Sequence, residues 1–176
     1  RYSTIENWSK NMYNLNTKRA RCEEEGEIEW ISGSFGSHVG YLYPMSVLSG
    51  RKSRSSFTGI TFAGAGQNLD TGCKVVLGAP DTTATVETKS ISKGGGISTF
   101  RSSIVATPTA EGSAASVSCQ SLMLDDISRS DTIPAMDIRA KNVDIGHEAT
   151  IGRIGDDKIF YLMSRGISEE EARTMI

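Results

Sequence analysis

The side chains with the widest chemical range in this chain are three cysteines, and their spacing limits what they can do. Cys22, Cys73 and Cys119 are separated by 51 and 46 positions. An odd number of widely spaced cysteines provides neither a disulfide framework nor the C-x-x-C pairs of a structural zinc site. Each thiol must therefore be interpreted alone, and the ordinary role of a lone cysteine is that of a small buried apolar residue.

Other familiar catalytic motifs are incomplete. The run Gly94-Gly95-Gly96 lacks the Lys-Ser/Thr of a phosphate-binding loop, and no helix is predicted after it, which argues against ATP binding by this chain. The sequence contains no G-x-S-x-G nucleophile elbow. It has two histidines, and one of them, His147, stands directly beside Glu148. These motifs give little support to an enzymatic function.

Short β-strands are the elements that must position these side chains. Between about residues 19 and 152, no window keeps apolar residues at the i, i+3, i+4 and i+7 spacing of a helix. Alternating or β-branched runs recur instead, usually before a corner such as Gly33, Pro44, Asp70-Thr71-Gly72 or Gly94-Gly95-Gly96. The runs cover residues 28–31, 39–43, 58–62, 74–77, 83–87, 103–106, 115–119, 121–124, 135–139 and 142–145. Many short strands at even spacing predict an all-β fold.

A sandwich, a barrel and a parallel β-helix all fit this number of strands. Two features favour the β-helix. Small residues (Ala, Ser, Thr and Gly) occupy many strand positions, as a narrow interior requires, and the Asn-Gly and Asp-Gly dipeptides of two-residue hairpins are absent from the sequence.

The pattern changes to helix after Gly152. Asp156 and Asp157 precede an apolar segment that ends near Arg165 and Gly166, which are typical helix start and stop signals. Ser168 and Glu171 then have the spacing of a capping box. Two short helices are therefore predicted after the β-region.

Length and charge restrict the class of protein. The chain has 176 residues, the size of one domain, and its net charge of −2 predicts no general attraction to nucleic acid or anionic lipid. No apolar run approaches the ~20 residues that cross a bilayer, and no secretory leader opens the chain, so a cytoplasmic location is expected. Because the chain begins at Arg1 and stops within a helical pattern, we expect a fragment of a longer polypeptide.

Several separated segments carry a resemblance to a known family. The run from Ile145 to Gly155 (IGHEATIGRIG) and the segment from Phe160 to Ala172 (FYLMSRGISEEEA) closely resemble the C-terminal signature of the SufB/SufD family. The opening runs 2–8 and 17–20 are similar to the central segment of that family, and DTG at 70–72 and PTA at 108–110 occur in the expected order. Within the family, HEA at 147–149 looks like SufB. The resemblance covers almost the whole chain.

This resemblance implies both a fold and a function. It implies a right-handed parallel β-helix over residues 1–155, and over residues 156–176 the start of a helical segment that docks a SufC-type ABC ATPase. It also implies a scaffold rather than an enzyme, on which a transient iron–sulfur cluster is held at a subunit interface, with none expected in the isolated fragment. The implied partners are the ATPase, a SufD-type subunit or a second copy paired through the β-helix, and apo-proteins that accept the cluster.

The resemblance points to Cys119, His147 and Glu148 as the residues that hold the cluster, with Cys119 and Glu148 as metal ligands. Iron–sulfur clusters usually have four thiolate ligands, so the remaining ligands would come from a partner subunit. Cys119 and His147 are 28 positions apart, which suits neighbouring turns. Adjacent strand residues point to opposite faces, so His147 and Glu148 reach one cluster only if the interface or a bulge turns the backbone. On the resemblance to SufB, Glu148 is preferred to His147 as a ligand. Each residue also has a structural alternative: Cys119 would pack in the core, His147 would be hydrogen-bonded at a subunit interface, and Glu148 would be a structural carboxylate.

The resemblance also places Glu6, Trp8 and Lys18 at family positions that face the interior of the β-helix, along a polar path for sulfur. Glu6 departs from the glutamine that the family often has there, and a carboxylate disfavours passage of an anionic sulfur species. A Glu6–Lys18 charge pair beside a buried Trp8 is the structural alternative. Cys22 and Cys73 are expected only to pack.

Two other functions remain open from the sequence. A SufD-like subunit would pair and position the ATPase without cluster ligands of its own. A polysaccharide-modifying β-helix enzyme would line one face with acids, bases and aromatics, whereas here the charges are scattered and aromatic residues make up 7% of the chain.

Overall fold

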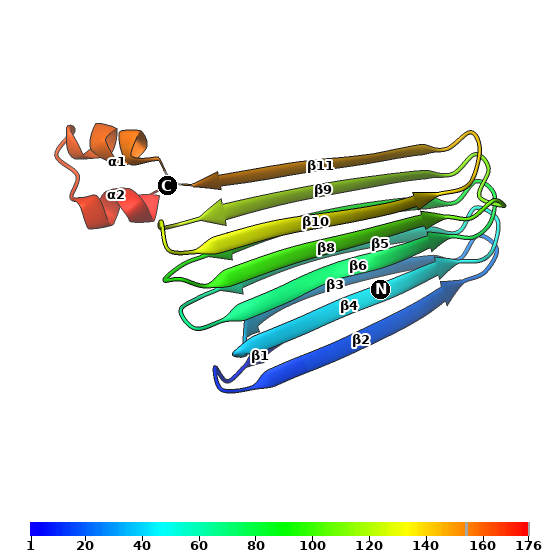
Figure 1. Cartoon of the computed structure of the whole chain (residues 1–176), viewed down its shortest axis with the longest axis horizontal. Coiled ribbons are helices and arrows are strands. Elements are labelled where there is room, and N and C mark those ends of the chain that lie inside the picture. Colours follow the sequence, from blue (N-terminus) through cyan, green and yellow to red (C-terminus); the bar gives the residue numbers. More distant parts are fainter. Residues whose placement is uncertain (154, 176) are drawn as a thin grey trace.

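A computed structural model describes the chain except Ile154, Ile176 and the side chain of Thr174. Within the described residues, strands follow one another up to Arg153, and two helices come after them (Figure 1). The elements are β1 (Tyr2–Trp8), β2 (Tyr13–Cys22), β3 (Glu27–Gly36), β4 (Val39–Leu48), β5 (Arg54–Ala63), β6 (Asn68–Leu77), β7 (Thr83–Ser92), β8 (Ile97–Ala106), β9 (Ala114–Met123), β10 (Arg129–Ile138), β11 (Asp144–Arg153), α1 (Asp156–Met163) and α2 (Glu169–Met175).

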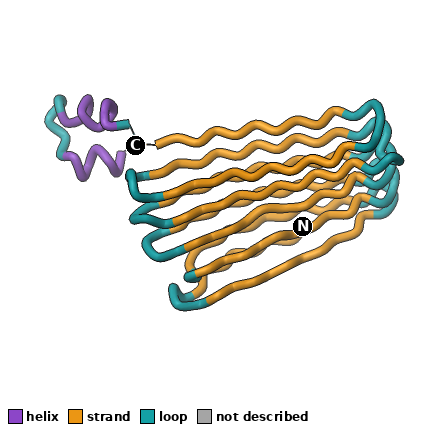
Figure 2. The backbone as a smooth tube through the Cα atoms, in the orientation of Figure 1, coloured by secondary structure: helices purple, strands orange, loops and turns teal. Residues whose placement is uncertain are grey.

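The strands form two parallel sheets that together make a flattened solenoid. The first sheet has the order β1-β3-β5-β7-β9-β11, and the second has the order β10-β8-β6-β4-β2. The chain alternates between the sheets, so one strand from each completes a turn, and the loops gather at the two ends of the strands (Figure 2). The predicted all-β parallel β-helix with two short C-terminal helices is confirmed, and the sandwich and barrel are excluded.

Side chains alternate between the interior and the outer faces along each strand. In β9, for example, alternate residues from Ala115 to Met123 are buried. Residues one turn apart stack in register, so that Trp30 lies beside Phe57, then Val86, then Val117. This stack is part of the buried apolar core, and burial of that core provides the main driving force for folding.

The strands are longer than the sequence pattern predicts, and three predicted corners lie inside them. Gly33, Pro44 and Asp70-Thr71-Gly72 belong to β3, β4 and β6. Gly72 is needed for close strand packing rather than for a turn, because a Cβ there would lie 1.8 Å from the Arg101 carbonyl oxygen. Pro44 has no N–H to donate, and the pairing of β4 with β6 skips Tyr43 and Pro44. Gly94 and Gly95, with φ of +66° and +80°, do form the predicted corner.

The turn after β9 is anchored to that glycine corner by Asp125. The Asp125 carboxylate accepts hydrogen bonds from the backbone N–H groups of Gly94, Ile127 and Ser128. The Gly95 N–H donates to the Ser128 hydroxyl. The glycine run of the sequence therefore serves to stack two turns, and the N–H groups of Gly94 and Gly95 donate to this carboxylate and hydroxyl.

Replacing Asp125 with asparagine is expected to destabilise the fold most near neutral pH. Hydrogen bonds from Ser128 and from the Gly94 N–H hold the pKa of the Asp125 carboxyl below its ordinary value. Such a carboxylate stabilises the fold above its unfolded-state pKa, and this contribution is lost as the pH falls through the folded-state pKa. Thermal midpoints of the two proteins should differ at about pH 7 and converge at about pH 2. A constant difference across this range contradicts the prediction, and Asp126→Asn, at an exposed ion pair, is the control.

The two helices pack against each other at the end of β11 (Figure 1). Ile159 of α1 and Ala172 of α2 are buried. The predicted capping box is present, because the Glu171 N–H donates to the Ser168 hydroxyl while the Glu171 carboxylate accepts from the Ser168 N–H. Gly166, with φ of +89°, lies in the connection between the helices. Neither helix is long and apolar enough to span a membrane.

Candidate functional site

Cys119 and His147 meet inside the last turns of the solenoid. Cys119 lies on β9 with 2% of its surface exposed, and β11 pairs alongside so that His147 is opposite Val117 and Ala149 is opposite Cys119. The Cys119 Sγ is 3.8 Å from His147 Nε2. It is also 3.6 Å from the Oγ1 of Thr132, which reaches it from β10 of the opposite sheet. A thiol, an imidazole and a hydroxyl therefore surround one point of the interior.

Glu148 lies on the other face of the same strand. It is exposed and pairs with Ser118, whose neighbour on β7 is Glu87. The register of β11 with β9 is continuous from Asp144 to Arg153, so no bulge within this strand turns Glu148 inward. The structure thus brings Cys119 and His147 together and separates both from Glu148.

The site is at an open end of the solenoid. Among the described strands, β11 is the last of the first sheet and β10 is the last of the second. Interior-facing residues of these strands are partly uncovered, with Met136 41%, Ile138 46% and Ile151 46% exposed. Both edge strands also leave backbone N–H and C=O groups free to pair with another strand.

The donor set in this chain is small. Within residues 1–153 and 155–175, no group of three or more His, Cys, Asp and Glu side chains is arranged to hold a metal ion. Cys119 and His147 supply two donors of the kinds that bind iron. A metal centre at this point would need ligands from outside the described residues.

The other two cysteines are packed in the core, as the sequence predicts. Cys22 and Cys73 are 5% and 3% exposed. Burial raises the pKa of the Cys73 thiol to about 12, and burial also raises the pKa of Cys22. Thiols held protonated in this way are poor nucleophiles and poor metal ligands at neutral pH.

Glu6 and Lys18 form a charge pair at the opposite end of the interior. Lys18 Nζ is 3.3 Å from Glu6 Oε1, and the amides of Asn14 and Asn16 also donate to this carboxylate. Trp8 is 48% exposed, so the buried tryptophan expected beside the pair is absent at this position. The tryptophan that packs inside is Trp30, whose Nε1–H donates to the Ser46 hydroxyl over 2.9 Å.

A row of interior hydroxyl groups lies between these two ends, and no local sequence pattern indicated it. Glu6 pairs in register with Ser34, followed turn by turn by Thr61, Ser90 and Ser121. The Ser90 hydroxyl donates to Ser121 over 2.8 Å. The signal was the repeat of Ser or Thr at positions 34, 61, 90 and 121, which becomes visible once the length of each turn is known.

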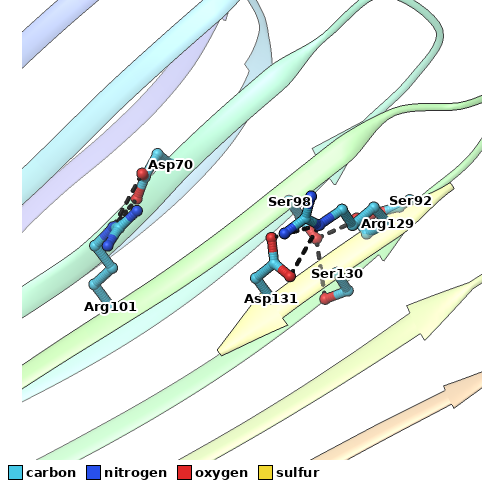
Figure 3. Close-up of polar contacts among 7 residues, drawn as sticks. All are labelled: Asp70, Ser92, Ser98, Arg101, Arg129, Ser130 and Asp131. Carbon is cyan, nitrogen blue, oxygen red and sulfur yellow. Dashed lines mark hydrogen bonds and ion pairs between the residues drawn. The ribbon is translucent and has the colours of Figure 1, made fainter. Parts of the chain in front are cut away.

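Figure 3 shows further hydroxyl contacts between and within the sheets. Ser98 of the second sheet contacts Ser92 of the first sheet at 2.9 Å and Ser130 of its own sheet at 3.3 Å. The ion pairs Asp70–Arg101 and Arg129–Asp131 are also drawn there, and they lie on the partly exposed outer face of the second sheet. Exposed pairs of this kind contribute little to stability, whereas the buried hydroxyls must find partners.

Comparison with known proteins gives one consistent result. The family model described as SUF system FeS cluster assembly, SufBD core domain, matches residues 1–176. The iron–sulfur cluster assembly protein SufB of Bacillus subtilis is 46% identical over all 176 residues, which cover 38% of that protein. A SufBD family protein of Mycobacterium leprae is 45% identical, and the chain covers 20% of it.

The chain thus spans well under half the length of these curated relatives. The match includes the whole solenoid and both helices, so it covers the Cys119–His147 site as well as the Glu6–Lys18 pair. On this evidence of sequence and fold, the chain belongs to the SufBD family of iron–sulfur cluster assembly proteins.

Proposed function

We propose that this chain is the scaffold on which a nascent iron–sulfur cluster is held at the open end of the solenoid. The observation that carries the proposal is the 3.8 Å approach of Cys119 Sγ to His147 Nε2 beside two edge strands, each paired on one side only. Cys119 and His147 are the proposed ligands from the interior, and Glu148 is a candidate ligand at the outer face of the same edge. The cluster is the cargo of this site.

An incomplete ligand set suits such a role. A cluster enclosed by four thiolates is held firmly, whereas a scaffold must pass its cluster to an apo-protein. The missing ligands would come from a partner that pairs with the open end, either a SufD-type subunit or a second copy of this chain. The exposed apolar residues Met136, Ile138 and Ile151 support burial of this end in a complex.

The helical pair is the proposed contact for a SufC-type ATPase. Phe160, Tyr161 and Met175 are 73%, 55% and 66% exposed, so both helices present large apolar side chains that a partner could bury. ATP hydrolysis by that separate subunit would drive the assembly cycle, and the chain itself would not be an enzyme. The complex would act in the cytoplasm.

The polar row inside the solenoid is a proposed path for sulfur. It begins at the Glu6–Lys18 pair and reaches Ser121, two residues beyond Cys119. Lys18 supplies a positive charge for an anionic sulfur species, and Glu6 offsets that charge. Trp8 lies at the exposed end of the same strand as Glu6.

Anaerobic cluster reconstitution with the partner subunits tests the scaffold proposal. Cys119→Ser and His147→Ala are each expected to lower cluster absorbance and transfer to an apo-protein by about tenfold or more. Cys73→Ala, at a buried thiol on β6, two strands from β10 in the second sheet, is the matched control. Retention of the cluster in both site variants rejects the proposal, and loss of the cluster in Glu148→Ala assigns a ligand to the outer face.

A SufD-like pairing subunit is the second candidate function. The observation that favours it is the lack of a three-residue metal-binding group within the described residues. In that case the solenoid would position ATPase subunits, and the Cys119 and His147 variants would assemble clusters normally while variants of the edge strands would dissociate the complex.

A further inference from the structure

Thr132 lies across the interior from Cys119, on the opposite sheet. Its Oγ1 is 3.6 Å from Cys119 Sγ, while His147 Nε2 is 3.8 Å from the same sulfur. The three residues come from β10, β9 and β11, the last three strands of the solenoid. The sulfur therefore meets a hydroxyl from one sheet and an imidazole from the other.

The position of the Thr132 hydroxyl is set by its strand. β10 pairs with β8 in continuous register from Arg129 to Ile138, which places Thr132 beside the buried Phe100. Threonine is branched at Cβ, so few side-chain rotamers are open to it. Cys119 is held more firmly still, because β9 is paired with strands on both sides, whereas β10 is paired with β8 alone. The distance between the two groups is thus determined by the spacing of the sheets.

The contact of Thr132 differs from those of other interior hydroxyls. Ser90 bonds Ser121 at 2.8 Å, and Thr61 bonds Thr71 at 3.3 Å, so these hydroxyls satisfy one another. Thr132 instead faces a sulfur. Sulfur is a weak acceptor as a thiol, and it becomes a strong one as a thiolate or a metal ligand.

We propose that Thr132 is a positioning residue for the metal-binding sulfur of Cys119, an inference that rests on the scaffold function proposed above. A metal-bound cysteine sulfur carries no proton, so in this contact the hydroxyl is the donor. The hydrogen bond holds the sulfur in place and withdraws electron density from it. Hydrogen bonds to ligating sulfurs tune iron–sulfur centres, and a less electron-rich sulfur suits a site that releases its cargo.

Anaerobic titration with Co²⁺ of the metal-free complex, in which the partner subunit completes the ligand set, tests this role. The sulfur-to-cobalt charge-transfer band is assigned to Cys119 by its loss in Cys119→Ala. Thr132→Val keeps the shape of the side chain and removes the hydroxyl, so the band is expected to move to longer wavelength because the sulfur becomes a better electron donor. Thr132→Ser restores the hydroxyl and is expected to return the band to its original position.

Thr71→Val is the matched control. Thr71 occupies the same row of the second sheet two turns earlier and bonds Thr61 rather than a sulfur, so its replacement should leave the band unmoved. Circular dichroism establishes that each variant is folded, and Thr132→Ala replaces Thr132→Val if the latter does not fold.

The outcomes separate the two proposals. Absence of any Cys119-dependent thiolate band in the unmodified complex overturns the metal site at Cys119, and the role of Thr132 with it. A band that is present but unmoved by Thr132→Val, or moved equally by the Val and Ser replacements, overturns the role of Thr132 alone.

Discussion

Replacing Lys18 with methionine is expected to lower the free energy of unfolding by about 3 kcal/mol. Lys18 Nζ lies 3.3 Å from Glu6 Oε1, and the two side chains are only 14% and 8% exposed. Methionine fills a similar volume but leaves the Glu6 carboxylate buried without its counter-charge. Asn14 and Asn16 continue to donate to that carboxylate, but neutral amides replace only part of the lost attraction. Urea unfolding followed by circular dichroism measures the change.

Two further variants make this prediction specific to the buried charge. The double variant Glu6→Gln with Lys18→Met is expected to recover most of the loss, because glutamine carries no charge. Arg139→Met breaks the pair with Asp137, in which the side chains are 65% and 45% exposed, and is expected to cost less than about 1 kcal/mol. Equal losses in Lys18→Met and Arg139→Met would show that burial of the Glu6–Lys18 pair has no energetic consequence.

Replacing Gly72 with alanine is expected to destabilise the protein by about 3 kcal/mol. A Cβ at this position would lie 1.8 Å from the carbonyl oxygen of Arg101 and 2.9 Å from the ring of Tyr43. The first of these atoms is backbone of β8, so the contact is relieved only by moving strands apart. Thermal or urea unfolding, compared with the unmodified protein, gives the magnitude.

Gly146→Ala is the matched control for this prediction. It is also a glycine within a strand, but nothing lies within 4 Å of a Cβ built there. Its stability is expected to change by less than about 0.5 kcal/mol. If both variants lose the same stability, the cost reflects the general effect of alanine for glycine in a strand, and the close approach of β6 to β8 has no special role.

Much of the fold was predictable because it follows from local patterns. The alternation in β9 and the small residues throughout the strands indicate a narrow β-solenoid, and the Ser168–Glu171 spacing predicts the start of α2. The strand boundaries were less accessible. Proline and glycine usually indicate a turn when only nearby residues in the sequence are considered. Pro44 and Gly72 lie within strands here, because the residues that fit at these positions are determined by a neighbouring strand about thirty residues away in the sequence.

The candidate site was predictable in part. The spacing of Cys119 and His147 suited neighbouring turns, and the structure places them on adjacent strands. Thr132 could not have been found in this way, because its approach to Cys119 depends on the distance between two sheets. The roles of Cys119, His147 and Glu148 as cluster ligands remain predictions for the reconstitution experiment.

The sequence by itself determined the all-β class, the helical ending, the absence of a cysteine framework and the membership of a family, since each depends on residue type and short-range spacing. Only the tertiary structure decided which of these residues share a site. One step along a strand sends a side chain to the opposite face, so Glu148 points outward while His147 faces Cys119. One turn of the solenoid brings residues about thirty positions apart into contact, and the open end formed by β10 and β11 leaves the site beside surface that a partner can cover.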